Sequence, residues 1–213
     1  IKKDPTTQKT LAHWQKLGQF RKNHPAVGAG IHQQISALTE QEKWQSIIPL
    51  AERIIQLTPD DVSSEGGYQI KATALRKLDR HEEESVLLRF IADHESSAMP
   101  IFLRLIELDL LRKDWSQVKI NAQRAMALSP FLRTPQQALA ESSEALGKKF
   151  DAIEAYRRLL ILDPGSRAMT HYHLAKLIRD TDAPQAKKHL LDSLALAPRF
   201  REGMTLLREW SSL

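Results

Sequence analysis

The sequence predicts an all-α solenoid, a row of stacked helix pairs, and three observations support this prediction. Prolines recur at a fixed step, since Pro130, Pro164 and Pro198 are each 34 residues apart. Pro25 and Pro59 are separated by the same 34 residues, and a period of about 20 to 50 residues is typical of a solenoid. Apolar residues between the prolines recur at the three-and-four spacing of helix faces. The 213-residue chain also has an ordinary globular composition, 42% hydrophobic and 27% charged.

Each period divides into two helices joined by a short polar corner. Residues 102–111 (FLRLIELDLL) carry apolar side chains along one helical face. A corner at 112–115 leads into residues 116–128, where Val118 and Ala125 belong to a second apolar face. The two following periods repeat this scheme, and the proline at the end of each disfavours the helical conformation in the residue before it. We therefore predict that the second helix of each unit ends at this proline, where the next unit begins.

Local signals indicate where individual helices begin and end. Thr39–Glu42 forms a candidate capping box before the next helix. Gly147 suits a left-handed helix stop, and Asp182 and Ser116 stand where an N-cap or first-turn residue is favourable. Pro49 either lies in the first turn of its helix or kinks that helix.

The units resemble tetratricopeptide repeats (TPR), whose pattern places small or aliphatic residues at fixed positions, an alanine early in the second helix and a proline at its end. The matching residues in three successive units are Trp115, Val118, Ala125 and Pro130, then Ala140, Leu146, Gly147, Ala152 and Pro164, then Leu174, Ala175, Ala186 and Pro198. The resemblance implies a right-handed α-α superhelix of about five helix pairs with terminal helices. The five predicted repeats are 27–61, 62–97, 98–131, 132–165 and 166–199.

Two terminal segments flank the repeats. Residues 1–26 are predicted to form a helix that is either a cap or the second half of an earlier repeat, and two copies of the chain could pair through the terminal helices. Residues 200–213 are predicted to form a capping helix that covers the last apolar face, with an inward stripe of Phe200, Met204, Leu207 and Trp210. Residues 13–30 resemble the segment that leaves the catalytic barrel of bacterial alpha-amylases, which suggests descent from, or attachment to, a larger protein.

Motifs of catalysis and metal binding are missing from the sequence, so we expect no enzyme, no cofactor and no metal site. The chain has no cysteine, which excludes disulfides and thiolate ligands. His171 and His173 are two residues apart on a helix and so point in different directions. The stretch HEEES begins like a zinc-peptidase helix at His81, but Ser85 stands where the second histidine is required.

Charge and hydropathy constrain the partners and the compartment. The net charge is +5, from 31 Lys and Arg against 26 Asp and Glu, and the basic pairs are interleaved with acids along the chain. This indicates a mixed-charge surface, so we do not expect nucleic-acid binding. No apolar run reaches the roughly 18 residues of a membrane span. The chain starts at Ile1 rather than at a methionine, and its first residues do not form a signal peptide, so we expect a processed chain or a fragment. The compartment stays open between cytoplasm and, for a processed chain, periplasm.

The predicted function is a non-catalytic scaffold that binds a peptide or helix of a protein partner in a concave groove lined by the first helices of the repeats. In the family's geometry the groove residues are Gln69, Thr73 and Arg76, then Arg104 and Glu107, then Gln137 and Glu141, then Tyr172 and Lys176. One alternative is the C-terminal repeat domain of a larger enzyme or secreted assembly. Another is an RNA-binding helical repeat, which would show a steep dependence of affinity on salt.

Overall fold

The computed structural model describes residues 25–211, apart from 96, 163–164 and 166. These described residues hold eleven α-helices and no β-strand, so the all-α prediction is confirmed. No helix in this part of the chain combines the length and the apolar character needed to cross a bilayer. The predictions for residues 1–24, and for the corner at Asp163 and Pro164, lie outside the described residues.

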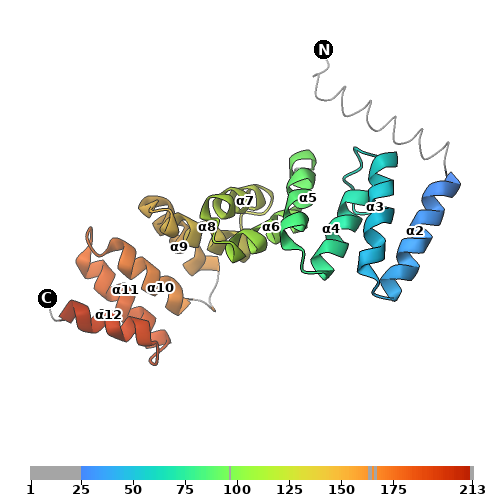
Figure 1. Ribbon diagram of the computed structural model, residues 1–213. Helices are drawn as coiled ribbons and strands as arrows, with labels where there is room; N and C mark the ends of the chain where they lie inside the picture. The colour runs from blue at the N-terminus through green and yellow to red at the C-terminus, as the bar shows by residue number, and fades with distance from the viewer. Residues whose placement is uncertain (1–24, 96, 163–164, 166, 212–213) are drawn as a thin grey trace, which may run out of the picture. The chain divides into compact units, whose positions relative to one another are not determined.

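The helices follow one another with short connections, as Figure 1 shows. They are α2 (Pro25–Glu40), α3 (Trp44–Leu57), α4 (Gly67–Lys77), α5 (His81–His94), α6 (Met99–Leu111), α7 (Trp115–Leu128), α8 (Arg133–Ala145), α9 (Lys149–Leu162), α10 (Arg167–Ile178), α11 (Ala183–Leu196) and α12 (Arg201–Ser211).

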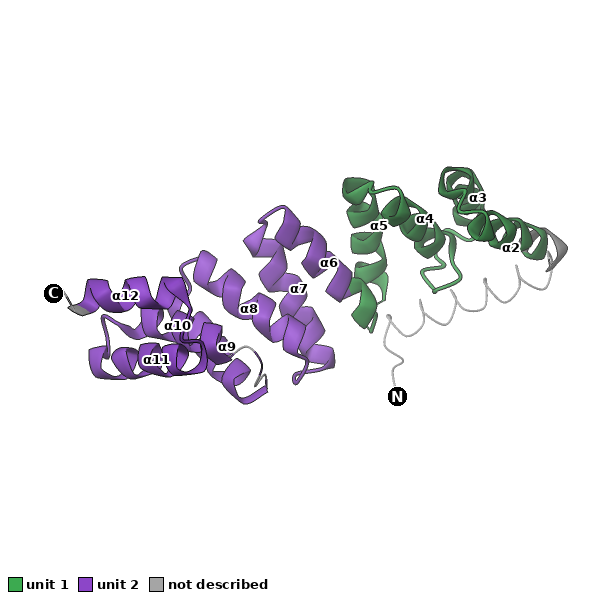
Figure 2. Ribbon diagram, turned by 90° about the horizontal axis from the view of Figure 1, so that it is seen from below, with its two compact units in different colours: residues 1–101 green, residues 102–213 purple. Residues whose placement is uncertain are grey.

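The chain divides into two compact units, one ending at Ile101 and the other beginning at Phe102 (Figure 2). In the first unit α2 packs on α3, α3 on α4 and α4 on α5. In the second unit each helix from α7 to α12 packs on the next one along the chain. Short connections make neighbouring helices antiparallel, and this succession of neighbours is the packing order of a solenoid.

Four of the corners between paired helices share one backbone conformation. The second residue after α2, α4, α6 and α8 has a positive φ angle, at Glu42 (53°), Asp79 (55°), Lys113 (57°) and Gly147 (67°). The N–H of the next residue then bonds to a carbonyl five positions earlier, as in a Schellman motif. These bonds are Lys43 to Leu38 (2.9 Å), Arg80 to Leu75 (3.0 Å), Asp114 to Asp109 (2.9 Å) and Lys148 to Ser143 (2.8 Å). The predicted left-handed stop at Gly147 is therefore confirmed.

One of the three predicted N-terminal signals needs correction. The capping box at Thr39 is wrong because α2 continues through Glu40, and the Thr39 hydroxyl donates to the Ile35 carbonyl at 2.8 Å. At α7 the cap is Asp114, whose side chain accepts from the Gln117 N–H, and Ser116 lies in the first turn of the helix, one of the two places predicted for it.

Asp182 caps α11 as predicted, with its carboxylate 3.0 Å from the Gln185 N–H. Pro49 lies inside α3 rather than in its first turn, on the exposed side of a helix that continues to Leu57.

The small positions of the second helices are fully buried. Ala125, Ala152 and Ala186 each have 0% of their surface exposed, as expected where helix axes approach to about 8–10 Å. At the C-terminus α12 packs on α11. The predicted inward stripe of α12 is wrong at Met204, which is 42% exposed, because Gly203 lies against Phe200 and Leu194 instead.

Candidate functional site

In the first unit, a pocket of about 180 Å³ lies among α2, α3, the α3–α4 connection and α4. Two of the predicted groove residues, Gln69 and Thr73, line it. The third predicted residue of this helix, Arg76, is exposed in the last turn of α4 and is not part of the lining. The complete lining is Ile35, Thr39, Trp44, Ile47, Ser64, Gln69, Ile70, Thr73 and Ala74.

The pocket in the first unit joins an apolar floor to a polar rim. Ile35, Ile47 and Ala74 belong to the buried core, while the Thr73 hydroxyl is bonded to the Gln69 carbonyl at 2.8 Å. Gly67 lets α4 start close to α3, since a Cβ at this position would lie 2.6 Å from the Ala51 carbonyl oxygen. The arrangement offers apolar surface and hydrogen-bonding groups together, as ligand-binding pockets do.

In the second unit, four predicted groove residues form pairs within their own helices. Arg104 and Glu107 make an ion pair of 3.0 Å on α6. On α8 the Gln137 amide donates to the Glu141 carboxylate at 2.8 Å. Such pairs at i,i+3 and i,i+4 hold long side chains in place on a helix surface.

The last two predicted groove residues lie together on α10. The Lys176 ammonium lies 5.6 Å from the centre of the Tyr172 ring, within cation–π range. The same ammonium is 3.5 Å from a Glu144 oxygen on α8. Tyr172 also packs edge-on against Phe200 at 5.0 Å, so its ring is held from two sides.

Glu144 is the centre of a polar cluster that was not among the predicted residues. One of its carboxylate oxygens accepts a hydrogen bond from the Tyr156 hydroxyl at 2.8 Å and lies 2.8 Å from His173 Nδ1. The rings of Tyr156 and His173 stack at 4.9 Å. The cluster thus connects α8, α9 and α10. Its signal in the sequence was the spacing of Gln137, Glu141 and Glu144 along one face of α8.

The Glu144 cluster shifts two pKa values. Burial raises the pKa of the Glu144 carboxyl, but the hydrogen bond and charge of His173, the Tyr156 hydroxyl and the charge of Lys176 outweigh burial, and the pKa falls to about 2. Burial, followed by the charge of Glu144, raises the pKa of Tyr156 well above its usual value. Both groups therefore hold their ionisation states at neutral pH: a carboxylate and a neutral phenol.

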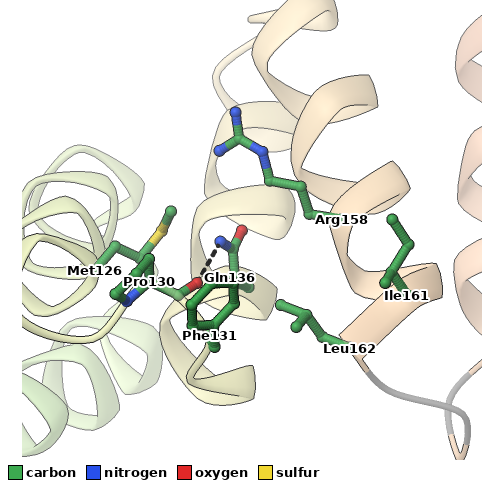
Figure 3. Close-up of a pocket in the computed structure, with 7 residues that line it drawn as sticks. All are labelled: Met126, Pro130, Phe131, Gln136, Arg158, Ile161 and Leu162. Carbon is green, nitrogen blue, oxygen red and sulfur yellow. Dashed lines mark hydrogen bonds between the residues drawn. The ribbon is translucent and has the colours of Figure 1, made fainter.

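A second pocket, of about 280 Å³, lies in the second unit beside the α7–α8 connection (Figure 3). Its lining includes Phe131 and Ile161, each 79% exposed. The Gln136 amide nitrogen donates to the Pro130 carbonyl at 3.1 Å, and its buried oxygen has no hydrogen-bond partner. The pocket was not predicted, although Phe131 directly follows a repeat-ending proline.

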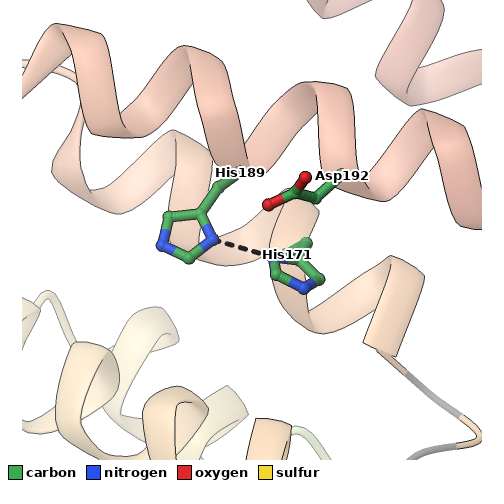
Figure 4. A group of neighbouring side chains, drawn as sticks. All are labelled: His171, His189 and Asp192. Atoms are coloured by element: carbon green, nitrogen blue, oxygen red, sulfur yellow. Dashed lines mark hydrogen bonds between the residues drawn. The ribbon is translucent and has the colours of Figure 1, made fainter.

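Three potential metal ligands meet between α10 and α11 (Figure 4). One ligand atom from each of His171, His189 and Asp192 lies within 4.8 Å of the others. The expectation of no metal site considered His171 with His173, whereas His173 contacts Glu144 and His171 faces His189 instead.

No family model and no curated protein matches the sequence. Solved structures do match in fold. YrrB, a TPR protein with an unusual peptide-binding site, superposes with a TM-score of 0.67 at 10% identity, over 90% of this chain and 97% of its own. MamA gives 0.58 at 14% identity, over 76% and 92%. MamA from Desulfovibrio magneticus RS-1 gives 0.57 at 14%, over 82% and 97%. The likeness to YrrB, together with the succession of helix pairs, shows that this chain has the tetratricopeptide-repeat fold.

Proposed function

We propose that this chain is a non-catalytic interaction module that binds a peptide segment of a protein partner on the face formed by the first helices of its repeats. The observation that carries the proposal is the pocket of about 180 Å³ lined by Gln69 and Thr73. Two residues selected as groove-facing by sequence thus line a cavity with an apolar floor.

The chemistry of this pocket indicates what part of a peptide it accepts. A volume of about 180 Å³ suits one large apolar side chain, and Trp44, Ile47 and Ile70 supply the matching apolar contact. The side chains of Gln69 and Ser64 can hydrogen-bond the adjacent peptide backbone. YrrB has the same fold and is described as binding peptide, which supports this use of the surface.

The second unit carries predicted groove residues of its own, and these residues are polar. Arg104, Glu107, Glu141 and Lys176 carry both signs of charge. These four side chains and Gln137 are all paired on the protein itself. Such a surface favours a partner segment of mixed polarity over a strongly acidic or basic one. We therefore expect binding that falls little with added salt.

A displayed library of random peptides, panned against the whole chain, provides probes for the proposal. Affinities of the enriched peptides are then measured by fluorescence anisotropy in EDTA. Replacing Gln69 or Thr73 by arginine places a long charged side chain at the pocket, and we expect each change to weaken binding at least about tenfold, or 1.4 kcal/mol.

Gln56→Arg is the matched control for Gln69→Arg. Gln56 is exposed on α3 and does not line the pocket, so this variant should bind like the wild type. An equal loss of peptide affinity in Gln69→Arg and Gln56→Arg would show that the pocket is not the binding site. Charge reversal of Arg104 and Lys176 tests the second unit in the same assay, and unchanged affinity in both would remove that surface from the site.

A further inference from the structure

The contact between His171 and His189 brings two metal-binding nitrogens together across a helix pair. Their Nδ1 atoms are 2.7 Å apart and their ring centres 5.0 Å apart. His171 is on α10 and His189 on α11, and Asp192 follows His189 by one helical turn. Figure 4 shows the Asp192 carboxylate beside the two imidazoles.

Buried neighbours fix the positions of these three side chains. On α11, Leu190 and Ser193 have 0% exposure and sit next to His189 and Asp192. The Ser193 hydroxyl donates to the Ala168 carbonyl of α10 at 2.7 Å, which sets the register of the two helices. Ligands carried by rigid, well-packed helices are already close to their binding positions.

The protonation states of the two histidines also suit metal binding. Burial lowers the pKa of His171, and burial followed by the charge of His171 lowers the pKa of His189. Metals bind the neutral imidazole, so burial of the two rings favours the ligating form. In the metal-free contact one Nδ1–H donates to the other Nδ1. On metal binding that proton moves to Nε2 of the same ring, so that both Nδ1 lone pairs face the metal.

We propose that His171, His189 and Asp192 form a Zn²⁺ site that ties α10 to α11. Two imidazole nitrogens and one carboxylate oxygen are a common three-ligand set for zinc, with a water in the fourth position. Nitrogens at about 2.0–2.1 Å from a tetrahedral zinc lie about 3.3 Å apart. The two rings therefore need to separate by about 0.6 Å from the 2.7 Å contact, a shift that small rotations of the side chains provide.

Positively charged side chains near the site limit its affinity for zinc. Arg167 acts on His171, and Arg157 and Lys188 act on His189, each through its positive charge. These cations repel a divalent ion, while the Asp192 carboxylate attracts it. The site is half-buried and open to exchange, so we expect reversible zinc binding rather than permanent retention through purification. The proposal is independent of peptide binding.

Isothermal titration of ZnCl₂ into the EDTA-treated, dialysed full chain tests this site. We expect one zinc ion per chain and a rise in melting temperature on zinc addition. Asp192→Asn and the double variant His171→Ala/His189→Ala should each bind zinc at least about tenfold more weakly and lose the rise in melting temperature. Their melting curves without zinc report whether the variants fold.

His32→Ala is the control for the histidine changes, because His32 is exposed on α2. It should bind zinc like the wild type. Nitrogen NMR shifts provide a second readout, since Nδ1 of His171 and of His189 should move on zinc addition. Wild-type affinity equal to that of the double variant, or a larger loss in His32→Ala, would overturn the proposal, as would zinc shifts confined to other histidines.

Discussion

Three side chains stand at backbone positions that favour glycine. Glu42, Asp79 and Lys113 have φ angles between 53° and 57°, and Gly147 occupies the equivalent place with a φ of 67°. A left-handed conformation costs a residue with a Cβ roughly 1 kcal/mol. The Schellman bonds at these corners compensate for that cost, so the strain is held locally by the turn.

Lys113→Gly should stabilise the protein by about 0.5–1 kcal/mol, since it removes the strain at a positive φ. Gly147→Ala should destabilise it by a similar amount for the converse reason. Urea unfolding measures both. Lys187→Gly, on the exposed side of α11, is the matched control and should lower stability by up to about 1 kcal/mol because its backbone is helical. A loss of stability in Lys113→Gly equal to that of Lys187→Gly would contradict the argument.

Glu144 makes the stability of the second unit sensitive to acid. Its pKa is about 2 in the folded chain against 4.5 as a free side chain. The folded state therefore takes up this proton at a lower pH than the unfolded state does. The stabilisation is complete above pH 5 and is lost as pH falls toward 2.

Screening by water at this partly exposed cluster limits the acid-induced loss of unfolding free energy to about 1–2 kcal/mol. Glu144→Gln should flatten the decline of unfolding free energy between pH 5 and pH 2. Glu154→Gln, at a surface pair with Arg157, should keep the decline of the wild type. Parallel curves for all three proteins would show that Glu144 is not responsible.

At the scale of the helices, small residues determine how closely neighbours pack. Ala125 on α7 and Ala152 on α9 are completely buried. Leucine at either position should overpack the contact and cost on the order of 1–3 kcal/mol, measured by thermal or urea unfolding. Ala127→Leu, exposed on α7, should change stability by less than about 0.5 kcal/mol. Unchanged unfolding in both buried variants would mean that the assigned register is wrong.

Helices and corners were predictable because their causes are local. The 34-residue proline step and the three-and-four spacing predicted helix pairs. The glycine at position 147 predicted the left-handed corner that the structure has there. Thr39 was misassigned because a threonine can bond either forward as a cap or back to the carbonyl four residues earlier. The choice depends on where α2 ends, and sequence patterns locate helix ends less well than helices.

The contacts between helices were less predictable. The Glu144 cluster requires the relative rotation of three helices, and that rotation depends on packing. The contact between His171 and His189 could be expected from the sequence, because each residue lies nine positions from Asp180 at the corner. Residues equally distant from the corner of an antiparallel helix pair lie at the same level along it, and they face each other when both are on the contacting sides. His173, on the same helix as His171, points in another direction and so does not indicate this pairing.

At the scale of the whole molecule, energetic coupling should follow the order of packing. α9 packs on α8 and α10, and a solenoid transmits strain chiefly between neighbours. Ala152→Leu should therefore raise amide hydrogen exchange in α8, α9 and α10. The helices α2 to α4 should exchange as in the wild type. A uniform rise over both units would indicate a single cooperative unfolding unit.

The indole of Trp44 lies in the wall of the first-unit pocket, so its fluorescence should respond to a peptide bound there. Water reaches this partly exposed ring in the empty pocket, and a guest residue would exclude that water. Emission from the unlabelled protein should then shift to shorter wavelength as the guest enters, and Trp44→Phe should abolish the shift. Trp44 fluorescence would thus report binding at the proposed peptide pocket without a label.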